Sequence, residues 1–148
     1  MEWTTKHFNE LTKEELYEIL KARVDIFVVE QECPYPEIDG KDPKAYHLMG
    51  REDGELAAYV RIFLPGDYFK EAAIGRVLVK EKFRRDSLGT ELMERAMRYL
   101  KEEWQVEEIK ISAQEYLLDF YNNLGFKRVS ETYLEDGIPH LDMLYQCN

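Results

Sequence analysis

One segment of the sequence combines residues that can hold an anion next to a buried strand. The apolar run 77–79 leads into a basic turn with Arg84 and Arg85, and a helix pattern follows from about residue 87. Free backbone amides and the helix dipole make such a helix start favourable for phosphate. Gly89 would let a ligand approach the backbone closely. The segment therefore predicts a pyrophosphate site, although a solvated helix cap would give the same pattern.

A second segment supplies a group that can donate a proton. A strand pattern at 109–113 is followed by Gln114 and by a helix pattern at 115–124 that contains Tyr121. A phenol can give a proton to a leaving group. The alternative is that Tyr121 packs in the core beside Phe120, as aromatic pairs in helices commonly do.

The elements that must position these residues alternate between helix and strand patterns. Thr12 and Glu15 have the spacing of a capping box, and apolar residues follow it at helical spacing, namely Leu16, Ile19, Leu20 and Phe27. The pairs Asp53-Gly54 and Asp136-Gly137 mark two hairpins. Further elements are expected at 47–51, 55–64, 72–79, 87–104, 126–134 and 140–145. This order predicts a mixed sheet with helices packed on it, an α/β (α+β) fold in a single domain, 1–148.

Composition narrows the functional class. The chain has 148 residues, 45% of them hydrophobic, and a formal net charge of −10. The acidic surplus argues against nucleic acid as a partner. No apolar run is long enough for a membrane span, and the first residues lack the features of a secretory signal. Two cysteines without metal-ligand spacing favour a reduced, cytoplasmic protein with no metal.

The two chemical segments together resemble the GNAT superfamily of acetyl-CoA-dependent acyltransferases. That superfamily has a phosphate loop of the form Arg/Gln-x-x-Gly-x-Gly/Ala, and a later helix ends Phe-Tyr-x-x-x-Gly-Phe, which matches 120–126 here. The whole chain is similar to the ElaA-type branch. That likeness rests on the stretches 27–35, 39–40, 74–77 and 135–140.

The resemblance implies a mostly antiparallel sheet of six to seven strands, splayed near its middle and flanked by helices. It implies acetyl-CoA as co-substrate and direct transfer, in a ternary complex, to a primary amine of a small molecule or peptide. The cofactor contacts it implies are Val77, Leu78, Val79, Arg84, Arg85, Asp86, Ser87, Leu88, Gly89, Thr90, Gln114 and Tyr121. A non-catalytic acyl-CoA sensor stays an alternative, and a homodimer stays open.

Candidate catalytic and acceptor residues follow from the same resemblance. Tyr121 would protonate the leaving thiolate. Glu30 and His140 are the main candidate bases, His140 because its ordinary pKa lies near neutrality, and Glu115 and Asp142 are further candidates. The acceptor pocket is expected to involve Phe27, Glu30, Gln31, Arg76 and His140. Arg76 lies in a buried strand and so needs a carboxylate, either from a structural ion pair or from the acceptor.

Two positions depart from the superfamily pattern. Ser87 stands where the loop usually has its first glycine. With a negative φ its hydroxyl can cap the helix, whereas a left-handed backbone at this position should weaken cofactor binding. Gln114 stands where many members carry an asparagine that bonds the pantetheine arm, and its longer amide can make the same bonds.

Overall fold

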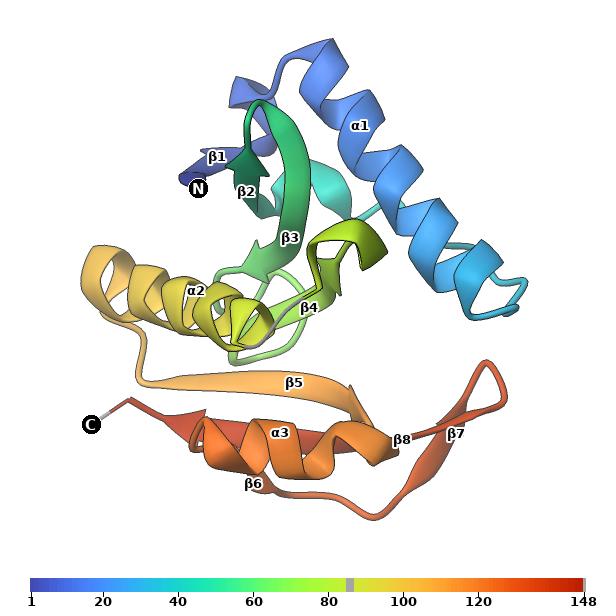
Figure 1. The fold of residues 1–148 in the computed structure, drawn as a ribbon. Helices are drawn as coiled ribbons and strands as arrows, with labels where there is room; N and C mark the ends of the chain where they lie inside the picture. The colour runs from blue at the N-terminus through green and yellow to red at the C-terminus, as the bar shows by residue number, and fades with distance from the viewer. Residues whose placement is uncertain (85–86, 148) are drawn as a thin grey trace.

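An eight-stranded sheet organises residues 1–84 and 87–147, which the computed structural model describes (Figure 1). The strands lie in the order β1-β2-β3-β4-β5-β8-β6, with β7 paired to β8. Their bounds are β1 Glu2–His7, β2 Tyr46–Glu52, β3 Glu55–Phe63, β4 Ala72–Val79, β5 Glu108–Gln114, β6 Lys127–Arg128, β7 Tyr133–Glu135 and β8 Ile138–Gln146. All neighbours are antiparallel except β4 and β5. The predicted fold class is confirmed.

The strand number exceeds the expected six to seven because the run 126–134 is not one strand. It forms β6 and β7, and the residues between them bend away from β8. The Arg128 guanidinium stabilises this bend by donating to the Ser130 carbonyl at 2.7 Å and to the Thr132 hydroxyl at 2.9 Å.

The helices are α1 (Lys13–Arg23), which continues as the π-helix η2 (Val24–Glu30), α2 (Leu88–Trp104) and α3 (Leu118–Asn123). Single 3₁₀ turns are η1 (Phe8–Glu10), η3 (Asp42–Lys44), η4 (Glu81–Phe83) and η5 (Glu115–Leu117). The predicted capping box opens α1: the Thr12 hydroxyl accepts from the Glu15 amide, and the Glu15 carboxylate accepts from the Thr12 amide. None of the helices described is long and apolar enough to cross a bilayer.

Both predicted hairpin turns have the geometry that Asp-Gly pairs favour. Asp53 and Gly54 have φ of 51° and 80°, and Asp136 and Gly137 have φ of 51° and 78°. Two successive positive φ angles define the type I′ turn, whose twist matches that of the flanking strands. These turns fix the registers of β2 with β3 and of β7 with β8.

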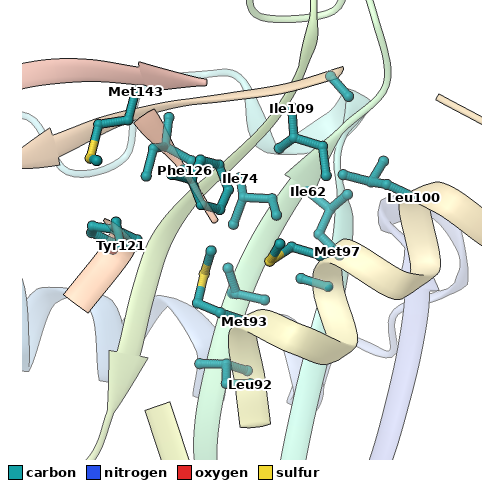
Figure 2. Close-up of a cluster of buried hydrophobic side chains, with 14 of the residues drawn as sticks. Ile62, Ile74, Leu92, Met93, Met97, Leu100, Ile109, Tyr121, Phe126 and Met143 are labelled. Atoms are coloured by element: carbon teal, nitrogen blue, oxygen red, sulfur yellow. The ribbon is translucent and has the colours of Figure 1, made fainter. Parts of the chain in front are cut away.

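The main core lies between the sheet and α2 with α3. The buried face of α2 carries Leu92, Met93, Ala96, Met97 and Leu100, at helical spacing. Figure 2 shows Met93 and Met97 close to Ile62 and Ile74 of the sheet, with Ile109 and Met143 beyond them.

Helix α1 covers the opposite face with Ile19, Ala22 and Ile26. The predicted apolar face of this helix was partly wrong, because Leu16, Leu20 and Phe27 are only partly buried. Arg23 occupies the fully buried stripe instead.

The sheet is splayed between β4 and β5. These parallel strands pair only at Ala72 with Ile109 and at Ala73 with Lys110, and beyond those pairs they diverge (Figure 1). A bulge accompanies the divergence, because the register of β3 with β4 shifts opposite Arg76, which has a φ of 53°. The predicted splay near the middle of the sheet is therefore present.

Candidate functional site

A cavity of about 500 Å³ occupies the region where β4 and β5 diverge. Residues from both faces of the sheet line it, including Leu117 and Tyr121 from the α3 side and Phe27 and Glu30 from the α1 side. Of the predicted site residues, the cavity lining includes Phe27, Glu30, Gln31, Arg76, Val77, Leu78, Val79, Arg84, Gln114, Tyr121 and His140. The fold thus brings together most residues that the sequence nominated.

The start of α2 follows shortly after Arg84, which borders this cavity, and no side chain of the described residues caps its first amides. Leu88, Gly89 and Thr90 form the first turn, and the earliest backbone bond there runs from the Glu91 amide to the Ser87 carbonyl at 2.9 Å. The first amides of a helix have no partner within it. With the helix dipole, they favour an anion such as a pyrophosphate.

Of the two conformations open to Ser87, the structure has the left-handed one. Its φ is 68°, in the left-handed region, and its hydroxyl makes no capping hydrogen bond. The turn therefore does require the backbone conformation that a glycine adopts without strain. Arg85 and Asp86, also expected at the cofactor, lie outside the described residues.

Arg84 is held at the edge of the cavity by two hydrogen bonds. Its Nε donates to the Val79 carbonyl at 2.8 Å, and its Nη2 donates to the Glu30 carboxylate at 2.7 Å. The side chain is 44% exposed, so the remaining N–H groups can reach a ligand. The carboxylate of Glu30 is engaged by this ion pair, which leaves it less free to act as a base.

Tyr121 lies on α3 with its ring in the core. The ring packs edge-on against Phe120 and Phe126, at centroid distances of 5.0 and 6.0 Å. Burial, assisted by the nearby Tyr116, raises the pKa of Tyr121 to about 12, so its hydroxyl stays protonated at neutral pH. The hydroxyl makes no hydrogen bond with another described residue, and Tyr121 borders the cavity. Core packing and a proton-donor role are thus compatible.

His140 has one ring nitrogen committed and one available. Its Nδ1 lies 2.7 Å from the Ile138 carbonyl, which can only accept, so Nδ1 carries a proton. Its Nε2 is then the basic nitrogen of the neutral ring, and it lies 3.5 Å from the Glu135 carboxylate. Of the two base candidates, His140 has the freer basic atom.

Two amides meet across the gap between the halves of the sheet. The Gln114 Nε2 at the end of β5 donates to the Gln31 Oε1 after η2, at 3.4 Å. Close to them, the Cys33 thiol lies 3.7 Å from the Asp136 carbonyl. These long contacts join the segment after η2 to β5 and to the turn between β7 and β8, next to Phe27 on the cavity wall.

Arg76 makes the structural ion pair that its burial demanded. Its Nε donates to Glu37 at 2.6 Å, and its Nη2 lies 3.4 Å from Asp39. The side chain is 19% exposed and still borders the cavity. Its Nη1 makes no hydrogen bond with another described residue.

Arg76 belongs to a larger buried network that the sequence analysis missed. Arg23 donates to Glu37 at 2.7 Å and to Asp42 at 2.6 Å. Arg61 donates to Asp39 at 2.8 Å and to the same Asp42 oxygen at 3.0 Å. An arginine on the apolar stripe of a helix was the available signal, because a buried guanidinium needs carboxylates. The network fixes the irregular segment 37–42 against α1, β3 and β4.

The charges of the network shift the acidities within it. Although burial opposes it, hydrogen bonds and attraction from Arg61 lower the pKa of Asp39 to about 2. Burial lowers the pKa of His47 to about 4, so this ring is neutral. Its Nδ1 lies 2.6 Å from the Tyr59 hydroxyl, and its Nε2 lies 3.2 Å from the Asp42 carbonyl. Among the described residues, no cluster of His, Cys, Asp and Glu could hold a metal ion.

A splayed mixed sheet, a helix start with free amides and a cavity that reaches both faces together define an acyltransferase-type fold. A family model for the acetyltransferase (GNAT) domain matches residues 9–147, and the chain belongs to this family. Protein ElaA of Escherichia coli is 40% identical over 145 residues, which are 97% of this chain and 95% of the relative.

Solved structures agree with this assignment. An acyl-CoA N-acyltransferase from Pseudomonas aeruginosa is 43% identical and superposes with a TM-score of 0.92, over 98% of this chain and 99% of that one. The crystal structure of Escherichia coli ElaA is 39% identical, with a TM-score of 0.91 and the same coverage of both chains. The predicted family and its ElaA-type branch are thereby confirmed.

Proposed function

We propose that the protein is an acetyl-CoA-dependent N-acetyltransferase that transfers acetyl directly to a primary amine of a small molecule or peptide. The observation that carries this proposal is the cavity in the gap between β4 and β5, whose lining comes from both faces of the sheet. Two substrates that enter from opposite faces would meet there without a covalent enzyme intermediate. The family and the acyltransferase neighbour support the reaction class.

The start of α2 and the gap suit the parts of an acyl-CoA. The amides of Leu88, Gly89 and Thr90, with Arg84, would hold the pyrophosphate. The pantetheine arm would lie along Val77–Val79, in the gap. A second cleft of about 460 Å³, between α2 and α3, is lined in part by Thr90 and would take the nucleotide end.

The acyl transfer needs a neutral amine and a protonated leaving group. His140 would accept a proton from the amine through Nε2, because its Nδ1 is committed to the Ile138 carbonyl. The amine nitrogen would then bond to the acyl carbon as the carbon–sulfur bond breaks. Tyr121 would give its proton to the departing thiolate, and its raised pKa keeps that proton in place until then.

Charge at the acceptor side favours a cationic amine. Glu135 and Asp136 border the cavity beside His140, while the arginines Arg61 and Arg76 are neutralised by carboxylates. With the net charge of −10, this arrangement attracts an ammonium group to the entrance.

The test is a transfer assay of the purified protein with acetyl-CoA over a panel of primary amines. Free thiol release would report turnover, and mass spectrometry would identify the acetylated product. We expect thiol release that depends on the amine and a product heavier by one acetyl group. Tight binding of acetyl-CoA by calorimetry with no transfer to any amine would instead support the non-catalytic sensor. A parallel series with longer acyl-CoA chains would test the preference for acetyl.

A further inference from the structure

A chain of three hydrogen-bonded side chains leads from the cavity to a carboxylate. The Ser112 Oγ on β5 lies 2.5 Å from the Tyr133 hydroxyl on β7, and that hydroxyl lies 2.7 Å from the Asp142 carboxylate on β8. Ser112 borders the cavity. Ser112 and Tyr133 were not among the site residues predicted from the sequence, and Asp142 was expected there only as a candidate base.

The pairing of β5 with β8 places this series of hydrogen-bonded side chains next to His140. Ser112 pairs with Asp142, and Gln114 pairs with His140, so all four side chains share one face of the sheet. The neighbouring residues Ile111 and Ala113 point to the opposite face, into the core under α2 and α3. The His140 ring also stacks on Tyr133, with centroids 6.2 Å apart and an interplanar angle of 22°.

The carboxylate at the end fixes the direction of both hydrogen bonds. An ionised Asp142 can only accept, so Tyr133 must donate its proton to it. The Lys110 ammonium lies 3.6 Å from the other carboxylate oxygen, on the side away from Tyr133. Because the Tyr133 proton is committed, Ser112 must donate its own proton to Tyr133. The Ser112 oxygen therefore has only lone pairs left for the cavity.

We propose that Ser112 recognises the amino group of the acceptor by accepting one of its N–H bonds, and that Tyr133 and Asp142 are positioning residues that hold Ser112 in this acceptor-only state. The proposal rests on the proposed function and specifies how the site selects its substrate. A neutral primary amine has two N–H bonds, one for Ser112 and one for His140, while its lone pair attacks. A secondary amine or an alcohol has only one such bond, so the site favours primary amines.

The test compares variants with a primary amine that the transfer assay has identified and with its N-methyl analogue. Ser112→Ala should raise KM for the primary amine on the order of tenfold, the effect of one lost hydrogen bond. The dissociation constant for acetyl-CoA should stay unchanged. The preference for the primary amine over its N-methyl analogue should fall by a similar factor, a result that a purely structural role would not produce.

Two further variants and a control sharpen this test. Tyr133→Phe frees the Ser112 proton to point into the cavity, so it should lower the same preference while Ser112 is intact. Ser112→Thr keeps the hydroxyl and should retain most of the preference. Thr132→Ala removes a neighbouring hydroxyl that bonds to Glu115 and Arg128 but not to Ser112, Tyr133 or Asp142, so it should leave the preference for the primary amine unchanged.

The outcomes separate this proposal from the proposed function. Transfer to a primary amine with the same KM and the same preference in Ser112→Ala would overturn the role of Ser112 and leave the acetyltransferase intact. Absence of transfer to every amine by the unmodified protein would overturn the proposed function and this assignment with it.

Discussion

The guanidinium of Arg84 donates to the carboxylate of Glu30 at 2.7 Å. This ion pair joins the turn before α2, where the pyrophosphate is proposed to bind, to the last residue of η2 on the acceptor side. Both side chains border the same cavity. A ligand that binds to Arg84 must therefore share it with Glu30.

Replacing Arg84 should weaken cofactor binding. Arg84→Ala should cost about 1–3 kcal/mol of coenzyme A affinity, the loss expected for a charge-assisted phosphate contact. Glu30→Gln removes the competing carboxylate and should tighten binding by roughly 0.5 kcal/mol, since exposed ion pairs are weak. Isothermal titration calorimetry measures both. Lys82→Ala is the control, because Lys82 lies on the same turn but pairs with Glu55 at 2.9 Å. Equal losses of coenzyme A affinity in Lys82→Ala and Arg84→Ala would mean that the effect comes from net charge and not from a contact of Arg84.

Ser87→Gly should be neutral or stabilising. A left-handed backbone costs a residue with a side chain about 1 kcal/mol or more, and the Ser87 hydroxyl makes no capping bond that would be lost. The greater freedom of glycine in the unfolded chain offsets part of this gain, so the expected change in unfolding free energy is between about 0 and +1 kcal/mol. Chemical denaturation measures it. Ser87→Ala keeps the Cβ and should change little, and a marked loss in either variant would contradict this account.

Tyr121→Phe should separate catalysis from packing. The ring contacts with Phe120 and Phe126 are kept, so the melting temperature and the cofactor affinity should barely change. The missing hydroxyl should lower kcat on the order of 10²-fold, the usual contribution of a positioned proton donor. The expected pKa of about 12 also means that Tyr121 does not deprotonate below pH 10, so no rate loss in that range belongs to it. An unchanged kcat with a lower melting temperature would make Tyr121 a core residue only.

His47 should make the protein sensitive to mild acid. Its folded pKa of about 4 lies below the ordinary value of 6.5, so between these values the unfolded state binds a proton that the folded state does not. Stability is then fully present above pH 6.5 and is lost as pH falls towards 4, by about 3 kcal/mol in total. Urea unfolding across pH 4–7 measures this slope.

The control for this change of unfolding free energy with pH is His47→Gln, which removes the titrating group. Its unfolding free energy should be lower at pH 7 but should vary less between pH 4 and 6.5. Asp39 and Asp42 do not contribute in this window, because their lowered pKa values place their stability changes below about 4. Parallel slopes in the two proteins would assign the acid sensitivity to other groups.

Local sequence patterns predicted the elements where one physical cause dominated. The capping box at Thr12, the two Asp-Gly turns and the apolar stripe of α2 each depend on residues close in sequence, and all are present. Gly125, in the motif at 120–126, has a φ of 102° directly after α3, the conformation that glycine favours after a helix. The family likeness nominated residues that line one cavity, and their functional roles stay predictions.

The failures arise from contacts between distant segments. A serine at position 87 does not by itself indicate a positive φ, because the conformation there depends on where α2 packs relative to the end of β4. The role of Arg23 depends on Glu37 and Asp42, which lie 14 and 19 residues further along the chain. The hydrogen bonds that connect Ser112 to Asp142 require the register of β5 with β8, which the sequence does not specify.

The buried ion-pair network around segment 37–42 restricts how the wall of the cavity on the acceptor side can change in evolution. Arg23 is fully buried and shared between Glu37 and Asp42, so neutralising any one of the three leaves an uncompensated charge, at a cost of about 3–5 kcal/mol. Viable changes must therefore occur in pairs, and these positions should covary among relatives. Cys33, which borders the cavity just before the network, carries no such constraint of charge, whereas the Tyr35 hydroxyl donates to Glu37. Selection for new acceptors would then act on residues 31–34, while the paired charges keep the wall in place.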